Sequence, residues 1–378
     1  MGDTQRSGRK HVVLTHEFFP YRGGIATWVE ELATAAVGLG FDIEVWCPAS
    51  PELASRTFAF PVRQLPVPGG QKLRSQLALA RYLRAHRADW EHAEILLPEP
   101  GPIRTFMAAR WFGIPVPARF RVVLHGTEAV KLAGSRITRG ALSALLAKAE
   151  RIVCVSQFTR AQLLARLPAL AATTTVSHAA PRTDLEVPPA SARLPHDPSE
   201  LVLLTVGRIG PRKGQLAVIE AIGKLPAELR ARVVYRIAGQ TNNTVYRTWL
   251  RATAAMKGVR LELLGKVPDA ALRDEYARAD VFAMTSKEFR GSVEGFGLVY
   301  LEAGLFRLPV LAHDTGGVSD AVVDGKTGFL VQPDDRDGLA AAIRRFAEDP
   351  ALRTTMGQAN FDWAASFSWA RLAEGVLG

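Results

Sequence analysis

Two glutamates, Glu294 and Glu302, stand out in the stretch SVEGFGLVYLEAG, residues 292–304. A Gly-Phe-Gly turn follows Glu294, and an apolar run typical of a helix carries Glu302. The first amides of a helix are free and partly positive, which suits a phosphate. A carboxylate among apolar neighbours needs hydrogen-bond donors, and ribose hydroxyls are good donors for it. The alternative for Glu302 is an ordinary glutamate on a helix surface.

A cationic loop, VGRIGPRKG at residues 206–214, follows an expected strand and carries Arg208 and Lys213 around Gly and Pro. A forked guanidinium and a compact ammonium on one loop are a suitable clamp for a diphosphate. The alternative is two solvated charges in a polar loop.

Composition indicates an ordinary globular chain. Its 378 residues, 48% hydrophobic and 22% charged, suit two domains. Two distant cysteines, Cys47 and Cys154, make neither a disulfide framework nor a metal-binding spacing, which predicts a reducing cytoplasm. We expect no transmembrane helix, since no apolar run approaches roughly 18–20 residues. The start, MGDTQRSGRK, lacks the apolar segment of a signal peptide.

The positive charge is concentrated in the first half. Residues 1–180 hold 22 Lys and Arg against 13 Asp and Glu, a balance of +9, whereas residues 181–378 hold 25 against 24, a balance of +1. Either the first half prefers an anionic partner, or the charge serves solubility alone. The basic stretch at 70–87 could rest on an anionic membrane, but its basic and apolar residues mix on a helical wheel, which favours a solvated helix. No nucleic acid is expected, because aromatic residues do not alternate with basic ones on one face.

Short strand-like runs alternate with helical runs on both sides of a Pro-rich linker at 180–200. This pattern predicts two α/β domains with parallel sheets. Ligands bind at the carboxyl ends of strands in such sheets, where the loops described above lie. The loop YRGGIA at 21–26 also lies at such an end. Its Gly23 and Gly24 would let a ligand approach the backbone, unless they make only a tight turn.

Taken in order, GRIGPRKG, SVEGFGLVYLEAG and HDTGGVSDAVVDGKTGFLV resemble family 4 of the retaining glycosyltransferases. The middle motif is similar to that of mannosyltransferases acting on phosphatidylinositol mannosides. The resemblance is weakest over about 50–120, where acceptor specificity usually lies. It implies the α/β GT-B fold, two Rossmann-like domains facing each other across a cleft. The implied domains are 1–185 for the acceptor, 186–360 for the nucleotide sugar, and a C-terminal helix, 361–378, that crosses back to the first domain.

The resemblance also implies residue roles. Arg208 and Lys213 would bind the donor diphosphate, Glu302 the ribose, and Glu294 the hydroxyls of the donor sugar. His125, in VVLHGTE, stands where the family often has a histidine near the donor sugar, although a lone histidine is also commonly structural. Val267, in the loop GKVPDAAL at 265–272, would meet the nucleobase through its backbone. The implied catalytic set is Glu294, Arg208, Lys213 and His125, and the implied donor-binding set is Gly23, Gly24, Arg208, Lys213, Val267, Glu294, Phe296, Gly297, Leu298, Val299 and Glu302.

The implied reaction is retaining transfer of a hexosyl group from a nucleotide-diphosphate sugar to a lipid, glycan or small-molecule acceptor. We expect no metal and no other cofactor, since the cationic loop and the helix start can stabilise the leaving nucleotide. The DDRD run at 334–337 is better explained by helix N-capping than by metal binding. GDP-mannose and UDP-hexoses are the leading donors by resemblance alone.

Other readings stay open. A non-catalytic GT-B module would bind a nucleotide sugar or an anionic partner without transfer, although intact Glu294, Glu302, Arg208 and Lys213 argue against it. We expect the protein in the cytoplasm, and peripheral association with the inner face of the membrane is an open alternative. The sequence does not choose the base, sugar, acceptor, linkage or oligomeric state.

Overall fold

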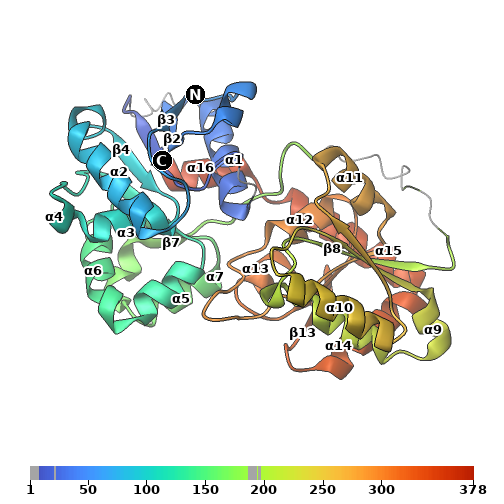
Figure 1. Cartoon of the computed structure of the whole chain (residues 1–378). Helices are drawn as coiled ribbons and strands as arrows, with labels where there is room; N and C mark the ends of the chain where they lie inside the picture. The colour runs from blue at the N-terminus through green and yellow to red at the C-terminus, as the bar shows by residue number, and fades with distance from the viewer. Residues whose placement is uncertain (1–7, 21–22, 186–193, 195–196) are drawn as a thin grey trace. The chain divides into compact units, whose positions relative to one another are not determined.

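The computed structural model describes residues 8–20, 23–185, 194 and 197–378 (Figure 1). It consists of two compact units. Unit 1 is Met1–Ala179 with Ser368–Gly378, and unit 2 is Ala180–Phe367. The first seven residues of the start MGDTQRSGRK, the first two residues of the YRGGIA loop and much of the predicted linker lie outside the described residues.

Unit 1 contains a seven-stranded parallel sheet in the order β3-β2-β1-β4-β5-β6-β7. Helices can cover both faces of such a sheet, which is why its central strands are buried along their whole length. The strands are β1 (His11–Leu14), β2 (Ile43–Pro48), β3 (Val62–Leu65), β4 (Glu94–Leu97), β5 (Phe120–Leu124), β6 (Arg151–Cys154) and β7 (Thr174–Val176).

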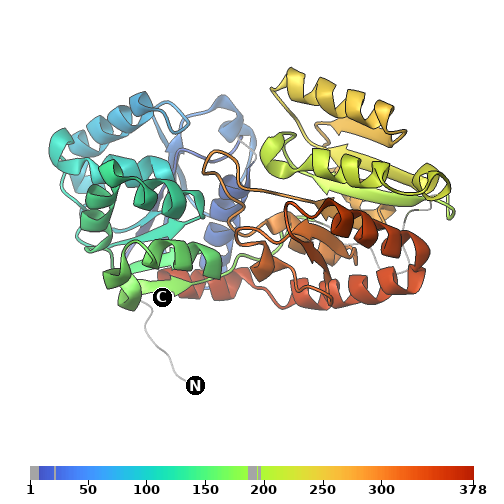
Figure 2. The same ribbon diagram turned by 90° about the horizontal axis from the view of Figure 1, so that it is seen from below.

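The helices of unit 1 pack around this sheet. The last helix of the chain, α16, packs against α1, as both ribbon views show (Figures 1 and 2). Arg151 Nη1 in β6 donates to Gly375 O at 2.5 Å, which ties α16 to the sheet. The helices are α1 (Gly24–Gly38), α2 (Leu73–Ala85), α3 (Pro100–Met107), α4 (Ala109–Phe112), α5 (Thr127–Gly134), α6 (Arg136–Leu146), α7 (Gln157–Leu164) and α16 (Trp369–Leu377).

Helix α2 covers the predicted basic stretch. It buries Leu79 and Leu83 against the core of unit 1, whereas Leu73 at its start is 65% exposed. Its basic residues, Arg74, Arg81 and Arg84, are exposed. The helix therefore buries one apolar face and presents charge to solvent.

Unit 2 contains a six-stranded parallel sheet in the order β10-β9-β8-β11-β12-β13. Its first strand in the sequence, LVLLTV, is buried at every position because strands pair with both of its edges and helices cover its faces. The strands are β8 (Leu201–Val206), β9 (Val233–Ala238), β10 (Arg260–Gly265), β11 (Val281–Met284), β12 (Val310–His313) and β13 (Gly328–Val331).

The helices of unit 2 pack against one another as well as against the sheet. Helix α8 packs against α10 and α14, and α12 packs against α15. The helices are α8 (Gln215–Gly223), α9 (Ala227–Arg232), α10 (Thr244–Met256), α11 (Asp269–Arg278), α12 (Leu298–Leu305), α13 (Val318–Ala321), α14 (Arg336–Glu348) and α15 (Pro350–Ala365).

Strand order reverses once in each sheet. The reversal lies between β1 and β4 in unit 1 and between β8 and β11 in unit 2. Loops leaving two such neighbouring strands diverge, and open α/β sheets bind ligands in the crevice between them. These two edges are therefore where a site is expected from topology alone.

Helix α12, which carries Glu302, is held at close range by α15. A Cβ added to Gly304 would lie 2.7 Å from Asn360 O and 2.8 Å from Ala364 Cβ. Asn360 Nδ2 also donates to Leu308 O, just beyond α12, at 2.8 Å. A glycine is thus required by the approach of two helices rather than by backbone conformation.

This close approach predicts that Gly304→Ala lowers the free energy of unfolding by about 1–3 kcal/mol, because an overpacked contact must be relieved by shifting backbone. Gly140→Ala in α6 is the matched control, since an added Cβ there meets nothing within 4 Å. It should be neutral or stabilising by up to about 1 kcal/mol. Denaturant unfolding of both variants measures the difference, and equal effects would contradict the packing argument.

Candidate functional site

Two loops meet at the carboxyl edge of the unit 2 sheet. The cationic loop follows β8, and the loop that carries Ser286 and Glu294 follows β11. Strands β8 and β11 are direct neighbours in the sheet. The sequence motifs predicted to bind a donor therefore leave the sheet at its topological switch point.

Three donors converge on one oxygen of Glu294. Its Oε2 accepts from Arg212 Nη1 at 2.9 Å, from Lys213 Nζ at 2.7 Å and from Ser286 Oγ at 3.0 Å. The Glu294 and Lys213 side chains are only 12% and 14% exposed. Attraction between charges is stronger at such a shielded position than at an open surface.

These contacts fix the charge state of Glu294. Burial alone would raise the pKa of its carboxyl group, but the charges of Lys213 and Arg212 lower that pKa to about 2. Burial lowers the pKa of Lys213, an effect that Glu294 opposes and that the charges of Arg212 and, to a smaller extent, Arg208 reinforce. An ionised carboxylate thus gathers several cations at one edge of the sheet.

The cationic loop contains one contact that sequence reasoning missed. Arg212 lies in the short 3-10 helix Pro211–Lys213, and it pairs with the same Glu294 oxygen as Lys213 does. The Arg208 side chain is exposed, and its carbonyl accepts from Gln215 Nε2 at 3.1 Å. The signal for Arg212 was its position next to Lys213 in the run PRKG.

A glycine contact holds this loop against the end of β11. Gly214 has φ +72°, and a Cβ added to it would lie 1.7 Å from Thr285 O. Thr285 Oγ1 donates to Gly214 O at 2.8 Å. Only glycine permits both this backbone conformation and this approach, so Gly214 sets the position of Lys213 relative to Ser286.

A third loop, DTGG after β12, supports the backbone of Glu294. Gly317 N donates to Glu294 O at 2.9 Å. A Cβ added to Gly316, which has φ +60°, would lie 2.3 Å from the same oxygen. The glycines of this motif therefore serve to position Glu294.

Helix α12 begins directly after Gly297. Leu298 and Val299 are its first residues, and amides at the start of a helix have no intrahelical acceptor. Phe296 is 4% exposed, and its ring packs on Phe367 with centroids 5.8 Å apart. Because the Phe296 side chain is buried, its backbone is the part suited to a ligand.

Glu302 lies inside α12 and is 4% exposed, which excludes the alternative of a surface glutamate. Its Oε2 accepts from Tyr276 Oη at 2.9 Å. Tyr276 lies on α11, and its ring stacks on Phe306 with centroids 5.0 Å apart. The carboxylate therefore has a buried phenolic donor from another helix, which no motif in the sequence indicated.

Val267 is half-buried in the loop between β10 and α11. The loop is anchored where β10 ends, because Gly265 O accepts from Gly239 N, just after β9, at 2.8 Å. It leads to Asp269, the first residue of α11, whose Oδ2 lies 3.6 Å from Arg182 Nη2.

The remaining predicted residues belong to unit 1, and they are described within that unit. Gly23 is the extended N-cap residue of α1 and Gly24 is its first residue. A Cβ added to either glycine would meet nothing within 4 Å. Packing among the described residues does not require glycine at these positions.

His125 follows β5 in a partly buried position and faces Trp28, with ring centroids 5.4 Å apart in an edge-on arrangement. Its Nε2 is buried without a hydrogen-bond partner among the described residues. Burial lowers the pKa of His125 to about 4, so the imidazole is neutral at pH 7. Its amide donates to Glu128 Oε2 at 2.9 Å, and burial raises the pKa of Glu128 to about 7.

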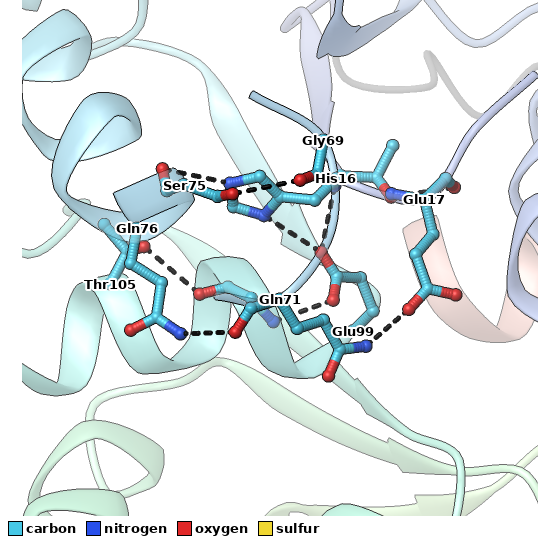
Figure 3. Close-up of polar contacts among 10 residues, drawn as sticks. His16, Glu17, Gly69, Gln71, Ser75, Gln76, Glu99 and Thr105 are labelled. Atoms are coloured by element: carbon cyan, nitrogen blue, oxygen red, sulfur yellow. Dashed lines mark hydrogen bonds and ion pairs between the residues drawn. The ribbon is translucent and has the colours of Figure 1, made fainter. Parts of the chain in front are cut away.

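A buried polar cluster fills the switch point of the unit 1 sheet (Figure 3). His16, after β1, binds Glu99, after β4, through its amide at 2.9 Å and its Nδ1 at 3.2 Å. His16 Nε2 lies 3.4 Å from Ser75 O in α2, and Gln71 Nε2 donates to Glu17 Oε1 in the same cluster. Sequence reasoning missed these residues, since no motif pairs positions so far apart in the chain.

Among the described residues, no cluster of three or more His, Cys, Asp or Glu side chains is suitable for a metal ion. As predicted for the DDRD run, Asp335 caps α14, and its Oδ1 accepts from Gly338 N at 2.7 Å. Within the same described part of the chain, no helix has both the length and the apolar character needed to span a bilayer.

Two family models match the chain. Residues 22–178 match Glycosyltransferase Family 4, and residues 188–363 match Glycosyl transferases group 1. The chain therefore belongs to family 4 of the glycosyltransferases, which are retaining and use nucleotide-sugar donors. Its two parallel α/β sheets form the GT-B fold, as the resemblance implied.

Two curated relatives illustrate the range of similarity. The GDP-mannose-dependent alpha-(1-6)-phosphatidylinositol monomannoside mannosyltransferase of Mycolicibacterium smegmatis is 29% identical over 404 aligned residues, covering 97% of this chain and 98% of that protein. The D-inositol 3-phosphate glycosyltransferase of Streptomyces avermitilis is 36% identical over 187 residues, covering 48% of this chain and 39% of that protein.

Solved structures support the fold. Sucrose-phosphate synthase from Thermosynechococcus elongatus has a TM-score of 0.76 at 22% identity and covers 97% of both chains. HepE from Anabaena, solved with UDP and glucose, has a TM-score of 0.73 at 19% identity and covers 97% of this chain and 98% of its own.

The Glu294 contacts predict a specific pH dependence of stability. A carboxyl pKa lowered from 4.5 to about 2 contributes stability above pH 4.5 that is lost as the pH falls through this window. At pH 7, Glu294→Gln should lower the free energy of unfolding by about 1–3 kcal/mol, because Lys213 and Arg212 lose their counter-charge. The difference in the free energy of unfolding between wild type and Glu294→Gln should shrink as the pH falls from 4.5 to about 2.

Denaturant unfolding of wild type and Glu294→Gln across this pH range measures this difference in the free energy of unfolding. Glu348→Gln is a suitable control, because Glu348 makes an exposed ion pair with Arg344. A difference in the free energy of unfolding that stays constant with pH would contradict the ion-pair account of Glu294.

Proposed function

We propose that this enzyme transfers a hexosyl group from a nucleotide-diphosphate sugar to an acceptor hydroxyl, with retention and without a metal ion. The convergence of Arg212, Lys213 and Ser286 on Glu294, beside the start of α12, is the observation that carries this proposal. Cationic groups, free amides and an ionised carboxylate are the groups that a diphosphate and sugar hydroxyls require.

In this proposal the donor lies along the carboxyl edge of the unit 2 sheet. Lys213 and Arg208 bind the diphosphate together with the amides of Leu298 and Val299. Glu294 and the backbone of Phe296 and Gly297 accept from the sugar hydroxyls. Glu302 accepts from the ribose hydroxyls, and the backbone around Val267 meets the base.

The chemistry follows from where charge develops. The bond between the sugar C1 and the diphosphate oxygen breaks, and negative charge grows on that oxygen. Lys213 and Arg208 stabilise this charge without reorganising solvent, which lowers the barrier. The acceptor hydroxyl forms the new bond on the same face of the sugar, and its proton passes to the departing phosphate.

In this proposal unit 1 binds the acceptor and also contributes three residues to the donor side. Gly23 and Gly24 allow the donor to approach its backbone, and neutral His125 offers its buried Nε2 to a sugar hydroxyl. A neutral imidazole suits this role because it can donate or accept a hydrogen bond without adding charge.

For the donor we infer GDP-mannose first and UDP-hexoses second, because a relative aligned over nearly the whole chain is a GDP-mannose-dependent mannosyltransferase. That relative acts on a lipid-linked glycoside, so an acceptor at a membrane lipid is the leading choice. The apolar face of α2 is buried in the core of unit 1, so peripheral attachment to an anionic inner membrane surface would rest on its exposed basic residues alone. We propose a location in the cytoplasm, with any membrane association at the inner face.

The donor site predicts stabilisation by one nucleotide. At a concentration about 100 times its Kd, the preferred diphosphate among UDP, GDP and ADP should add about 2.7 kcal/mol to the free energy of unfolding. A thermal melt should then rise by several degrees, equally with and without EDTA. The rise should largely vanish in Glu302→Ala and Arg208→Ala.

Arg260→Ala is the matched control, because Arg260 makes an exposed ion pair with Glu200 in the same unit. It should keep the full thermal shift. No shift from any of the three nucleotides with folded protein, or a shift that EDTA removes, would contradict the proposed donor site.

A further inference from the structure

Arg182 lies outside every motif, on the segment with which unit 2 begins. Its side chain is 17% exposed. Nε and Nη2 donate to the two carboxylate oxygens of Asp184 at 2.9 and 2.7 Å, and Nη2 lies 3.6 Å from Asp269 Oδ2. A forked guanidinium can hold two carboxylates in fixed directions, which a lysine cannot do.

The same side chain is linked to Glu302 through helix α11. Asp269, which pairs with Arg182, is the first residue of α11, and Tyr276 on the same helix donates to Glu302. Although burial opposes its charge, the bond to Asp184 and the charges of Glu302 and Asp269 raise the pKa of Arg182. Arg182 therefore holds the start of the helix whose Tyr276 contacts Glu302.

The buried carboxylate of Glu302 needs both hydrogen-bond donors and opposite charge. A carboxylate that is 4% exposed is costly unless opposite charge and donors hold it. Tyr276 supplies one donor to Oε2. The ion pair of Arg182 with Asp269 fixes the start of α11, the helix that carries Tyr276, and this preorganises the carboxylate for a pair of vicinal hydroxyls.

We propose that Arg182 is a positioning residue for the nucleoside end of the donor. By fixing Asp269 at the start of α11, it positions Tyr276 and so orients Glu302 toward the ribose hydroxyls, and it lets the loop around Val267 meet the base. The ligand is a ribonucleoside diphosphate. This inference rests on the proposed function, because it takes Glu302 as the ribose-binding residue.

A purely structural anchor makes a different prediction. If Arg182 only held the segment in place, its loss would weaken all ligands of unit 2 equally. If it orients Glu302, its loss weakens only ligands whose ribose hydroxyls Glu302 can accept from. A diphosphate with a 2′,3′-dideoxyribose separates the two roles.

The experiment is calorimetric titration of wild type and Arg182→Gln with the tightest binder among UDP, GDP and ADP, and with its 2′,3′-dideoxy counterpart. We expect Arg182→Gln to weaken the ribonucleotide about tenfold. The affinity for the dideoxy compound should fall less than about twofold, because this compound lacks the hydroxyls that Glu302 binds. Arg260→Gln, an exposed arginine paired with Glu200, should bind both compounds as wild type does.

Arg182→Lys keeps the charge but not the fork, and it provides a milder variant if Arg182→Gln fails to fold. It should weaken the ribonucleotide by about threefold and the dideoxy compound less. Equal losses for both compounds, or no loss, would overturn the role of Arg182 while the proposed function stands. If wild type binds none of the three nucleotides, the proposed function and this inference both fall.

Discussion

The ion pair between Glu294 and its cations is the interaction on which the unit 2 site depends. One carboxylate oxygen takes donors from Arg212, Lys213 and Ser286, which come from two loops on neighbouring strands. Without that charge, two cations would be crowded in a shielded position with nothing to offset their repulsion. In the proposed function, an anionic diphosphate shares these cations with the carboxylate or replaces it as their partner.

Backbone contacts keep this ion pair in register with the sheet. Gly214 meets the end of β11, and Gly316 with Gly317 meets the carbonyl of Glu294. Behind them, Gly304 lets α15 approach α12, so the helix that carries Glu302 cannot shift freely. The glycines in these motifs are thus explained by close approach of backbone, and they transmit the rigidity of the sheet to the loops that would bind the donor.

The sequence predicted the α/β class, the two sheets and the loops at strand ends, because long buried runs and Gly-rich turns are local signals. Strands β3 and β7 are short edge strands without a strong apolar run, so no local signal predicts them. Sequence reasoning also missed Arg212, Tyr276 and Arg182. A sequence pattern shows what stands next to a residue along the chain, whereas Tyr276 reaches Glu302, and Arg182 reaches Asp269, only after the sheet brings distant segments together.

The most direct test of this account is a crystal structure of the protein with its tightest-binding nucleotide sugar. The account predicts the diphosphate within hydrogen-bond distance of Lys213 Nζ, the sugar hydroxyls on Glu294 and the ribose hydroxyls on Glu302. The account would be contradicted by a nucleotide sugar bound away from the loops after β8 and β11, with no ligand atom in contact with Glu294 or Lys213.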